Sequence, residues 1–259
     1  MSGKIKGLMI DMDGVLYQGS HPVPGAVKAF KQLQKEKIPY RLLTNTTTQS
    51  RQSLRTKLKV MGFDVPEEYI FSAPYAASRF LQQKKVKNIY LFAQGTTSMD
   101  FKEFKITEID PEYVVIGDLA SDYTYDRLNK AFRLILNGAK MLAMQKNRFW
   151  KTESGFTLDV GAFVALLEYG ANQKAKLIGK PAKEFYKLAL NDMGLQAGNV
   201  AMIGDDVEVD IEGAQKAGCQ AIQVKTGKYR PEFEKELKIN PDYLIESFAD
   251  MPELYKKNS

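Results

Sequence analysis

The chain opens with an apolar run that stops abruptly at two aspartates, a combination compatible with few folds. Residues 7–10 form the run, and Asp11, Asp13 and Gly14 follow at once. Such a run predicts a strand buried in a parallel sheet. Two carboxylates at a buried strand end are costly unless something pairs with them, and a divalent cation such as Mg2+ is the natural partner. The same residues also suit a strand that ends in an Asx-type turn, so these positions alone leave both interpretations open.

The composition excludes several kinds of functional site. The 259 residues include a single cysteine, Cys219, and a single histidine, His21. One cysteine excludes an intramolecular disulfide and a cysteine-cluster metal site, and one histidine excludes a multi-histidine zinc centre. Acid–base chemistry in an enzyme of this composition would fall mainly to carboxylates and lysine. The chain length suits one large domain or two modest ones.

Charge and hydropathy favour a globular, cytoplasmic protein with no membrane or nucleic-acid partner. Hydrophobic residues make up 44% of the chain and charged residues 26%, as in soluble globular proteins. No apolar stretch approaches the roughly 20 residues of a membrane span, and the first residues do not resemble a signal peptide. The net charge of +6 is scattered over amphipathic segments. This distribution indicates solvated helix faces rather than a surface that binds nucleic acid.

Alternating strand and helix patterns predict an α/β fold with a parallel sheet. Near the N-terminus we expect strands at residues 38–43 and 70–71 and helices at residues 26–36 and 49–61. The alternation returns near the C-terminus. There we expect strands at residues 176–178, 199–203, 220–224 and 243–245, and helices at residues 181–193, 210–217 and 248–256.

The middle of the chain continues the alternation, but its predicted strands do not end in residues suited to catalysis. The expected strands lie at residues 88–92, 113–116 and 141–144, and the expected helices at residues 122–137 and 161–169. This pattern predicts an inserted α/β cap domain at residues 74–173. Residues 1–73 and 174–259 would then form a discontinuous, Rossmann-like core with a parallel sheet.

Polar groups of particular kinds follow the predicted strands of the core. They are Asp11 with Asp13, Thr44 with Asn45, Lys180, and Asp205 with Asp206 and Asp210. In an open α/β sheet, ligands bind outside the carboxyl ends of the strands, where the strand order reverses. Adjacent parallel strands would therefore bring these groups into one site. Carboxylates, Mg2+ and a lysine together form a site suited to a phosphoryl group.

These segments together resemble the four motifs of the haloacid dehalogenase superfamily, in its Mg2+-dependent aspartyl-phosphate phosphatases. The motif segments are residues 11–15, 43–45, 179–181 and 204–206 with Asp210. The insertion between the second and third motifs resembles the type IIA capped branch, which includes p-nitrophenyl phosphatase and pyridoxal phosphate phosphatase. The resemblance extends over nearly the whole chain. Residues 159–161, 213–215 and 224–230 resemble a subgroup with Ser at the position of Asp13, so the substrates of that subgroup are not transferred.

The resemblance implies catalytic roles for the matching residues. Asp11 corresponds to the nucleophile that becomes an aspartyl phosphate. Asp13 corresponds to the general acid that protonates the leaving oxygen and then serves as the base for water. Thr44 and Asn45 would hydrogen-bond the phosphoryl oxygens. Lys180 would neutralise negative charge on Asp11 and on the phosphoryl group.

The resemblance also implies a magnesium site. Asp11, the backbone carbonyl of Asp13, and Asp205 would be the Mg2+ ligands. Asp206 and Asp210 would support these ligands without contacting the metal.

The inserted domain would serve as a lid over a small phosphorylated metabolite. Phe149 with Trp150, and the loop at residues 95–98, are candidates for the surface that faces the substrate. His21, in the loop after Asp13, is a further candidate without an assigned role. A homodimer formed through the cap is the candidate assembly, because such dimers are common in the resembled branch.

Other functions of the same residue set remain open. A phosphomutase or phosphotransferase would use the same aspartyl-phosphate chemistry, usually with a smaller lid placed just after the first motif. A phospho-acceptor or scaffold module without catalytic activity would lack both the lid and the aspartate at position 13. A hydrolytic dehalogenase would also lack Asp13. The filled catalytic positions and the long insertion favour a phosphatase.

Overall fold

The computed structural model describes residues 4–152 and 155–259, which fall into two compact units. The first unit comprises Met1–Thr44, Leu54–Phe71 and Lys180–Ser259, and the second comprises Asn45–Ser53 and Ser72–Gly179. The boundaries of these units differ from those of the predicted domains, since residues 45–53, 72–73 and 174–179 group with the second unit. Each unit has its own sheet and is described separately.

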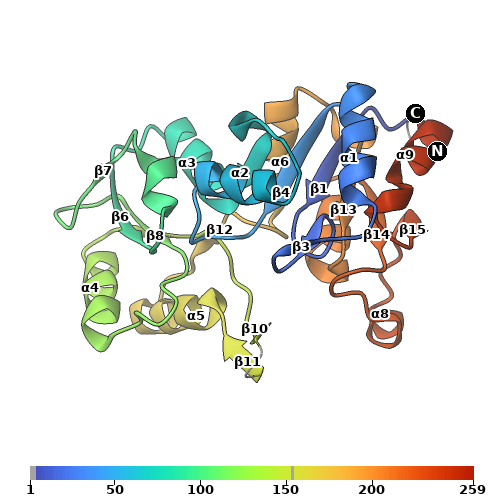
Figure 1. The fold of residues 1–259 in the computed structure, drawn as a ribbon. Coiled ribbons are helices and arrows are strands. Elements are labelled where there is room, and N and C mark those ends of the chain that lie inside the picture. Colours follow the sequence, from blue (N-terminus) through green and yellow to red (C-terminus); the bar gives the residue numbers. More distant parts are fainter. Residues whose placement is uncertain (1–3, 153–154) are drawn as a thin grey trace. The chain divides into compact units, whose positions relative to one another are not determined.

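A six-stranded sheet with the order β15-β14-β13-β1-β4-β5 forms the centre of the first unit (Figure 1). Its strands are β1 (Gly7–Asp11), β4 (Tyr40–Thr44), β5 (Ile70–Ser72), β13 (Val200–Gly204), β14 (Gln220–Val224) and β15 (Tyr243–Ile245). The pairings from β15 through β4 are parallel. The chain continues from β1 to β4 on one side, whereas β13 lies on the other side. The strand order therefore reverses beside β1, which is where ligands bind in sheets of this kind.

The first strand forms as its sequence predicts. All residues of β1 are buried, and so are all residues of β13, its neighbour in the sheet. A strand that is covered on both faces must be apolar throughout, which explains the continuous run at residues 7–10. The strand includes Asp11, so the first carboxylate is carried by the sheet itself.

Helices and short turns connect the strands of the first unit. The helices are α1 (Ala26–Lys35), α2 (Arg51–Val60), α6 (Lys183–Met193), α7 (Gly213–Lys216), α8 (Pro231–Leu237) and α9 (Met251–Asn258). The remaining elements are the strands β2 (Tyr17–Gln18) and β3 (His21–Pro22), the 3-10 turns η1 (Glu67–Tyr69), η3 (Ala197–Asn199) and η5 (Phe248–Asp250), and the π-helical turn η4 (Val207–Glu212). Helix α6 ends at Gly194, whose φ of 65° lies in the left-handed region. Glycine adopts this conformation without strain, so the predicted stop at Gly194 is confirmed.

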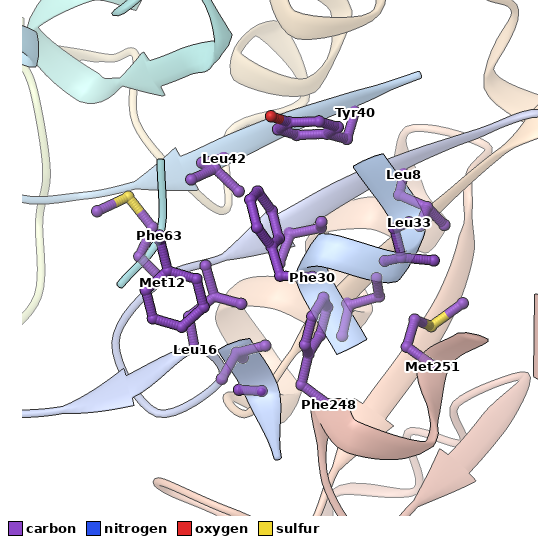
Figure 2. Packing of buried hydrophobic residues seen from close by; sticks show 14 of the residues in the cluster. Leu8, Met12, Leu16, Phe30, Leu33, Tyr40, Leu42, Phe63, Phe248 and Met251 are labelled. Carbon is purple, nitrogen blue, oxygen red and sulfur yellow. The ribbon is translucent and has the colours of Figure 1, made fainter. Parts of the chain in front are cut away.

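Helix α1 and its neighbours build the hydrophobic core on one face of this sheet (Figure 2). The ring centroid of Phe30 lies 5.2 Å from that of Tyr40 and 5.6 Å from that of Phe63, and both pairs pack edge to face. Edge-to-face packing is a favoured geometry of buried aromatic rings. Met12 and Leu16, which follow β1, belong to the same core cluster. The core therefore fixes the segment that carries the two candidate catalytic aspartates.

The second unit contains a five-stranded sheet with the order β12-β9-β8-β6-β7, in which every neighbouring pair is parallel (Figure 1). Its strands are β6 (Asn88–Phe92), β7 (Lys105–Ile106), β8 (Tyr113–Ile116), β9 (Lys140–Ala143) and β12 (Lys176–Leu177). Its other elements are α3 (Ala73–Gln83), α4 (Tyr125–Leu136), α5 (Val160–Ala171), the 3-10 turn η2 (Thr97–Phe101) and the antiparallel pair β10 (Phe149–Thr152) and β11 (Gly155–Leu158). The predicted α/β architecture, with a parallel core sheet and a second sheet in the insertion, is confirmed.

Two local predictions are wrong. The strand expected at residues 176–178 pairs with β9 in the second sheet, so Lys180 does not follow a strand of the core sheet. The short sequence of this strand did not indicate which strand it would pair with. The helix expected at residues 210–217 is instead a π-helical turn, η4, followed by the single-turn helix α7. The turn sets Asp210 near the strand ends, as described below.

The helices in the described part of the chain are short. The longest, α4 and α5, each have 12 residues. A helix that crosses a membrane needs about 20 predominantly apolar residues. Across residues 4–152 and 155–259, accordingly, no helix is suited to span a membrane.

Candidate active site

Polar side chains meet at the carboxyl edge of the core sheet because the strands run parallel and in register. Asp11 of β1 lies opposite Leu43 of β4, so Thr44 follows one position beyond it. Ile10 lies opposite Ile203 of β13, so Asp205 lies just beyond the position opposite Asp11. The register thus brings the ends of three neighbouring strands to one edge, as the sequence predicts.

Three buried carboxylates form the centre of this edge. Oxygen atoms of Asp11, Asp205 and Asp210 all lie within 4.8 Å of one another. The ammonium nitrogen of Lys180 donates 2.6 Å hydrogen bonds to Asp11 Oδ1 and to Asp210 Oδ1. Lys180 itself is only 3% exposed, so both ion pairs are shielded from water. Asp210 thus contacts Lys180 directly, and its predicted supporting role at the metal site stays a prediction.

The burial of these groups sets their protonation. Burial by itself lowers the pKa of the Lys180 ammonium, but the charges of Asp11 and Asp210 outweigh this effect and hold its pKa above the usual value. Lys180 is therefore a fixed cation. Burial raises the pKa of Asp205, and repulsion from Asp11 and Asp210 raises it further. Three buried carboxylates beside one ammonium leave more negative charge in the cluster than Lys180 alone can balance.

This donor set fits a hard divalent cation. Its three carboxylates supply oxygen ligands, which Mg2+ prefers, and one ammonium cannot neutralise all of them. The space around the Asp205 carboxylate is also restricted, because a Cβ atom at Gly14 or at Gly227 would overlap this carboxylate. Glycine at both positions leaves room for that carboxylate, and the buried acidic cluster can bind a metal ion.

Asp13 is not one of the three clustered carboxylates. Its side chain is exposed, whereas Met12 before it is buried in the core. The backbone of Asp13 is bridged to Tyr17, and Gly14 N donates a 2.7 Å hydrogen bond to Tyr17 O. Burial raises the pKa of Tyr17, and the charge of Asp13 raises it further, so this phenol stays protonated. A carboxyl group outside the buried cluster suits the predicted proton transfer, which stays a prediction.

The second motif follows β4 directly. Thr44 is the last residue of this strand and is buried. Asn45, the next residue, groups with the second unit, where its Oδ1 atom lies close to Gly179. The structure therefore assigns the two predicted phosphate-binding residues to different units, and their shared role stays a prediction.

Asp206 has a visible structural role. Its side chain accepts a 3.0 Å hydrogen bond from Val209 N and so caps the π-helical turn η4. The same carboxylate forms a 3.0 Å ion pair with the exposed Lys228 ammonium. Asp206 therefore supports the turn that carries Asp210, and the described acidic cluster does not include it.

The other candidates lie in the loop at residues 95–98, in strand β10 and in the short strand β3. In the second unit, Thr96 N donates to Thr48 O at 3.0 Å, and Thr97 Oγ1 donates to Thr47 O at 2.5 Å. These contacts anchor the loop at residues 95–98. Phe149 is exposed on β10, whereas the side chain of Trp150 lies outside the described part of the structure. His21 is exposed, and its Nδ1 atom lies 3.2 Å from Ser20 Oγ.

Sequence reasoning assigned no role to residues 226–228, which nevertheless contact the cluster. Lys228 N donates a 2.8 Å hydrogen bond to Asp205 Oδ2, and Thr226 Oγ1 donates a 2.5 Å hydrogen bond to Gly14 O. The signal that could have revealed them is Gly227, three residues after the buried strand β14 ends at Val224, because glycine often marks a close approach of the backbone to another group.

Comparisons with known proteins agree with this geometry. The haloacid dehalogenase-like hydrolase family matches residues 8–107, and a HAD-hydrolase-like family matches residues 177–251. The chain is 40% identical over 244 residues to haloacid dehalogenase-like hydrolase domain-containing protein 2 of Bos taurus, covering 94% of this chain and 93% of the relative. The chain belongs to the haloacid dehalogenase-like hydrolases.

Two further similarities place this haloacid dehalogenase-like hydrolase among phosphatases. It is 36% identical over 251 residues to phospholysine phosphohistidine inorganic pyrophosphate phosphatase of Danio rerio, covering 95% of this chain and 92% of the relative. Its fold matches p-nitrophenyl phosphatase from Archaeoglobus fulgidus with a TM-score of 0.90 at 26% identity, covering 97% of this chain and 99% of the other. The resemblance to the type IIA capped branch is confirmed, and the hydrolase is an enzyme of the phosphatase class.

Proposed function

We propose that this hydrolase is a Mg2+-dependent phosphatase that cleaves small phosphomonoesters through an aspartyl phosphate on Asp11. The observation that carries the proposal is the 2.6 Å hydrogen bond from Lys180 Nζ to Asp11 Oδ1 inside a buried acidic cluster. A carboxylate must be ionised to attack phosphorus, and an adjacent ammonium favours the ionised form. The same ammonium would also offset negative charge on a phosphoryl group that approaches Asp11.

In the first step, the substrate phosphoryl group binds at the carboxyl edge of the core sheet. The Thr44 hydroxyl and the Asn45 amide would hydrogen-bond its oxygens, and Lys180 would offset its negative charge. Asp11, Asp205 and the Asp13 carbonyl are the proposed Mg2+ ligands, with Asp210 as a further carboxylate of the same cluster. When bound, Mg2+ neutralises charge that otherwise repels the phosphoryl group from the carboxylates.

In the second step, a carboxylate oxygen of Asp11 attacks phosphorus while the bond to the leaving oxygen breaks. The Asp13 carboxyl group gives its proton to that oxygen, so the alcohol departs in neutral form. Asp13 suits this task because its side chain is exposed and stands outside the buried cluster. A carboxylate engaged by a metal would lose its proton too readily to act as the acid.

In the third step, water hydrolyses the aspartyl phosphate. Asp13, now ionised, takes a proton from the water as its oxygen attacks phosphorus, and the bond to Asp11 breaks. This returns Asp11 as a carboxylate and Asp13 as an acid, and inorganic phosphate leaves.

The proposed substrates are small phosphorylated metabolites. Nucleoside monophosphates, sugar phosphates, phosphoglycolate and pyridoxal phosphate are candidates, since the residues proposed for the core site would bind only the phosphoryl group that these compounds share. The name of the Danio rerio relative adds phosphoramidates and pyrophosphate to the compounds worth testing. p-Nitrophenyl phosphate suits the first assay, because its leaving group is readily detected and departs easily.

The decisive experiment compares wild type with Asp11→Asn in p-nitrophenyl phosphate hydrolysis, with Mg2+ and with EDTA. We expect wild type to turn over only with Mg2+ and the variant to be inactive, because an amide cannot act as the nucleophile. Acid quenching during turnover should trap a hydroxylamine-sensitive phosphoprotein in wild type alone. Equal turnover by the two proteins, or full activity in EDTA, would contradict the proposal.

A further inference from the structure

The segment that follows β14 passes across the end of β13 toward the loop after β1. In the sheet order, β13 lies between β14 and β1. Thr226 nevertheless donates a 2.5 Å hydrogen bond from Oγ1 to the carbonyl of Gly14, which belongs to the β1 loop. Residues 226–228, here called the strap, therefore connect two loops over the strand end that carries Asp205.

The strap lies close to Gly14 because both sides of the contact are glycine. A Cβ atom on Gly227 would lie 2.7 Å from Gly14 Cα, which is closer than real Cβ atoms approach another carbon. Gly227 also has a φ of 66°, a left-handed conformation that strains other residues. Sterics thus restrict position 227 to glycine through both its backbone conformation and its surroundings.

The Asp205 carboxylate lies in the gap between these two glycines. Cβ atoms at either position would overlap its Oδ2 atom. That same oxygen accepts a 2.8 Å hydrogen bond from Lys228 N. Contacts from two sides and a directed hydrogen bond leave the carboxylate little freedom to rotate.

We infer that the strap is a positioning element that holds Asp205 in its orientation for metal binding, an inference that rests on the proposed function. Thr226 anchors the strap to Gly14, Gly227 allows the close approach, and Lys228 N holds Asp205 Oδ2. Groups that orient a metal ligand by hydrogen bonding commonly change metal affinity by about 10- to 100-fold when altered. None of the three residues is itself proposed as a metal ligand.

The test measures metal affinity directly. Mn2+ replaces Mg2+, because both ions prefer oxygen ligands and free Mn2+ gives an EPR signal. Thr226→Val removes the anchoring hydroxyl at nearly constant shape, and we expect about tenfold weaker Mn2+ binding. Thr226→Ser is the matched control, since it keeps the hydroxyl and should bind Mn2+ within about twofold of wild type. Gly227→Ala places a Cβ atom in the gap that holds the Asp205 carboxylate, and it should weaken Mn2+ binding at least as much as Thr226→Val.

Circular dichroism establishes that each variant is folded before titration. Thr226→Val removes a hydrogen bond, whereas Gly227→Ala adds a Cβ atom next to Asp205. If one of these variants fails to fold, the other still tests the inference. Wild-type Mn2+ affinity in both Thr226→Val and Gly227→Ala would overturn the inference and leave the proposed phosphatase untouched. Weak binding in Thr226→Ser as well would also overturn it, because the hydroxyl would then not be the anchor. If wild type bound no Mn2+ and hydrolysed no phosphomonoester, the proposed function would fail first.

Discussion

Lys180 Nζ donates a 2.6 Å hydrogen bond to Asp11 Oδ1 across a sequence separation of 169 residues. Asp11 is held by the buried strand β1, and Lys180 lies shortly before helix α6. The same ammonium lies 2.6 Å from Asp210 Oδ1, so one cation serves two buried carboxylates. Removing one partner of a buried ion pair is far costlier than removing a surface pair, because a charge remains without compensation.

Lys180→Met should therefore impair both stability and catalysis. We expect the free energy of unfolding to fall by about 3–5 kcal/mol, as for other buried pairs that lose one partner. Turnover should fall at least about 100-fold, since a group that stabilises charge at the phosphoryl site is lost. Urea unfolding and p-nitrophenyl phosphate hydrolysis measure the two effects.

The control for this variant is Lys187→Met, the same substitution at an exposed position of α6. It should leave stability within about 0.5 kcal/mol of wild type, as is usual for surface positions. A Lys180→Met protein as stable and active as this control would show that the buried ion pairs contribute to neither stability nor turnover.

Asp13→Asn should separate the two halves of the proposed reaction. The amide cannot give a proton to the leaving oxygen or take one from water, but Asp11 remains able to attack phosphorus. With p-nitrophenyl phosphate, whose leaving group needs little protonation, the phosphoprotein should form and then accumulate. With an alkyl phosphate, formation itself should slow by about 100-fold or more, the usual contribution of a general acid.

Acid-quench trapping of the phosphoprotein over time gives the measurement for Asp13→Asn. An equal slowing for both kinds of leaving group would argue against Asp13 as the acid.

Phe30→Ala tests the core beneath the candidate site. Phe30 is 1% exposed and packs edge to face against Tyr40 and Phe63 (Figure 2). Its removal leaves a cavity, so stability should fall by about 3–5 kcal/mol in urea unfolding. Phe156→Ala, at a side chain that is 71% exposed, should change stability by less than about 0.5 kcal/mol. Similar losses in the two variants would contradict the packing described for α1.

The single thiol should report on folding. Cys219 is buried, and burial raises its pKa to about 12. A cysteine of ordinary pKa, about 8.5, is partly thiolate at pH 8, and the thiolate is the reactive form. Because the pKa is raised, folded protein at pH 8 should react with a disulfide reagent far more slowly than protein unfolded in urea. Release of the reagent's chromophore follows both reactions, and equal rates would show that Cys219 is accessible.

Much of the architecture followed from local patterns in the sequence. The run at residues 7–10 predicted β1 because a strand covered on both faces must be apolar. The strand limits predicted at residues 88–92, 113–116 and 220–224 are those observed for β6, β8 and β14. Lys176 and Leu177 show the limit of such patterns, since they form a strand but pair with β9 in the other sheet. A two-residue strand contains too little side-chain information to select its neighbour.

The charged residues of the candidate site show the same division. Asp11, Lys180, Asp205 and Asp210 could be named as candidates from the sequence, because residue types and motif spacing are local properties of the chain. The direct contact between Lys180 and Asp210, and the strap that holds Asp205, could not be predicted in this way. Asp210 reaches Lys180 from a π-helical turn, whose extra residue shifts side chains away from the positions of a regular helix.

Local sequence patterns thus predicted the strands of the core sheet and the charged residues that follow them, but not short strands such as β7, β10 and β11. The sharing of the Lys180 ammonium by two carboxylates, and the enclosure of Asp205 between Gly14 and Gly227, emerged with the folded sheet. These contacts could not be predicted because they join residues far apart along the chain. Local patterns depend on neighbours a few residues away, whereas these contacts join segments that only the packing of the whole sheet brings together.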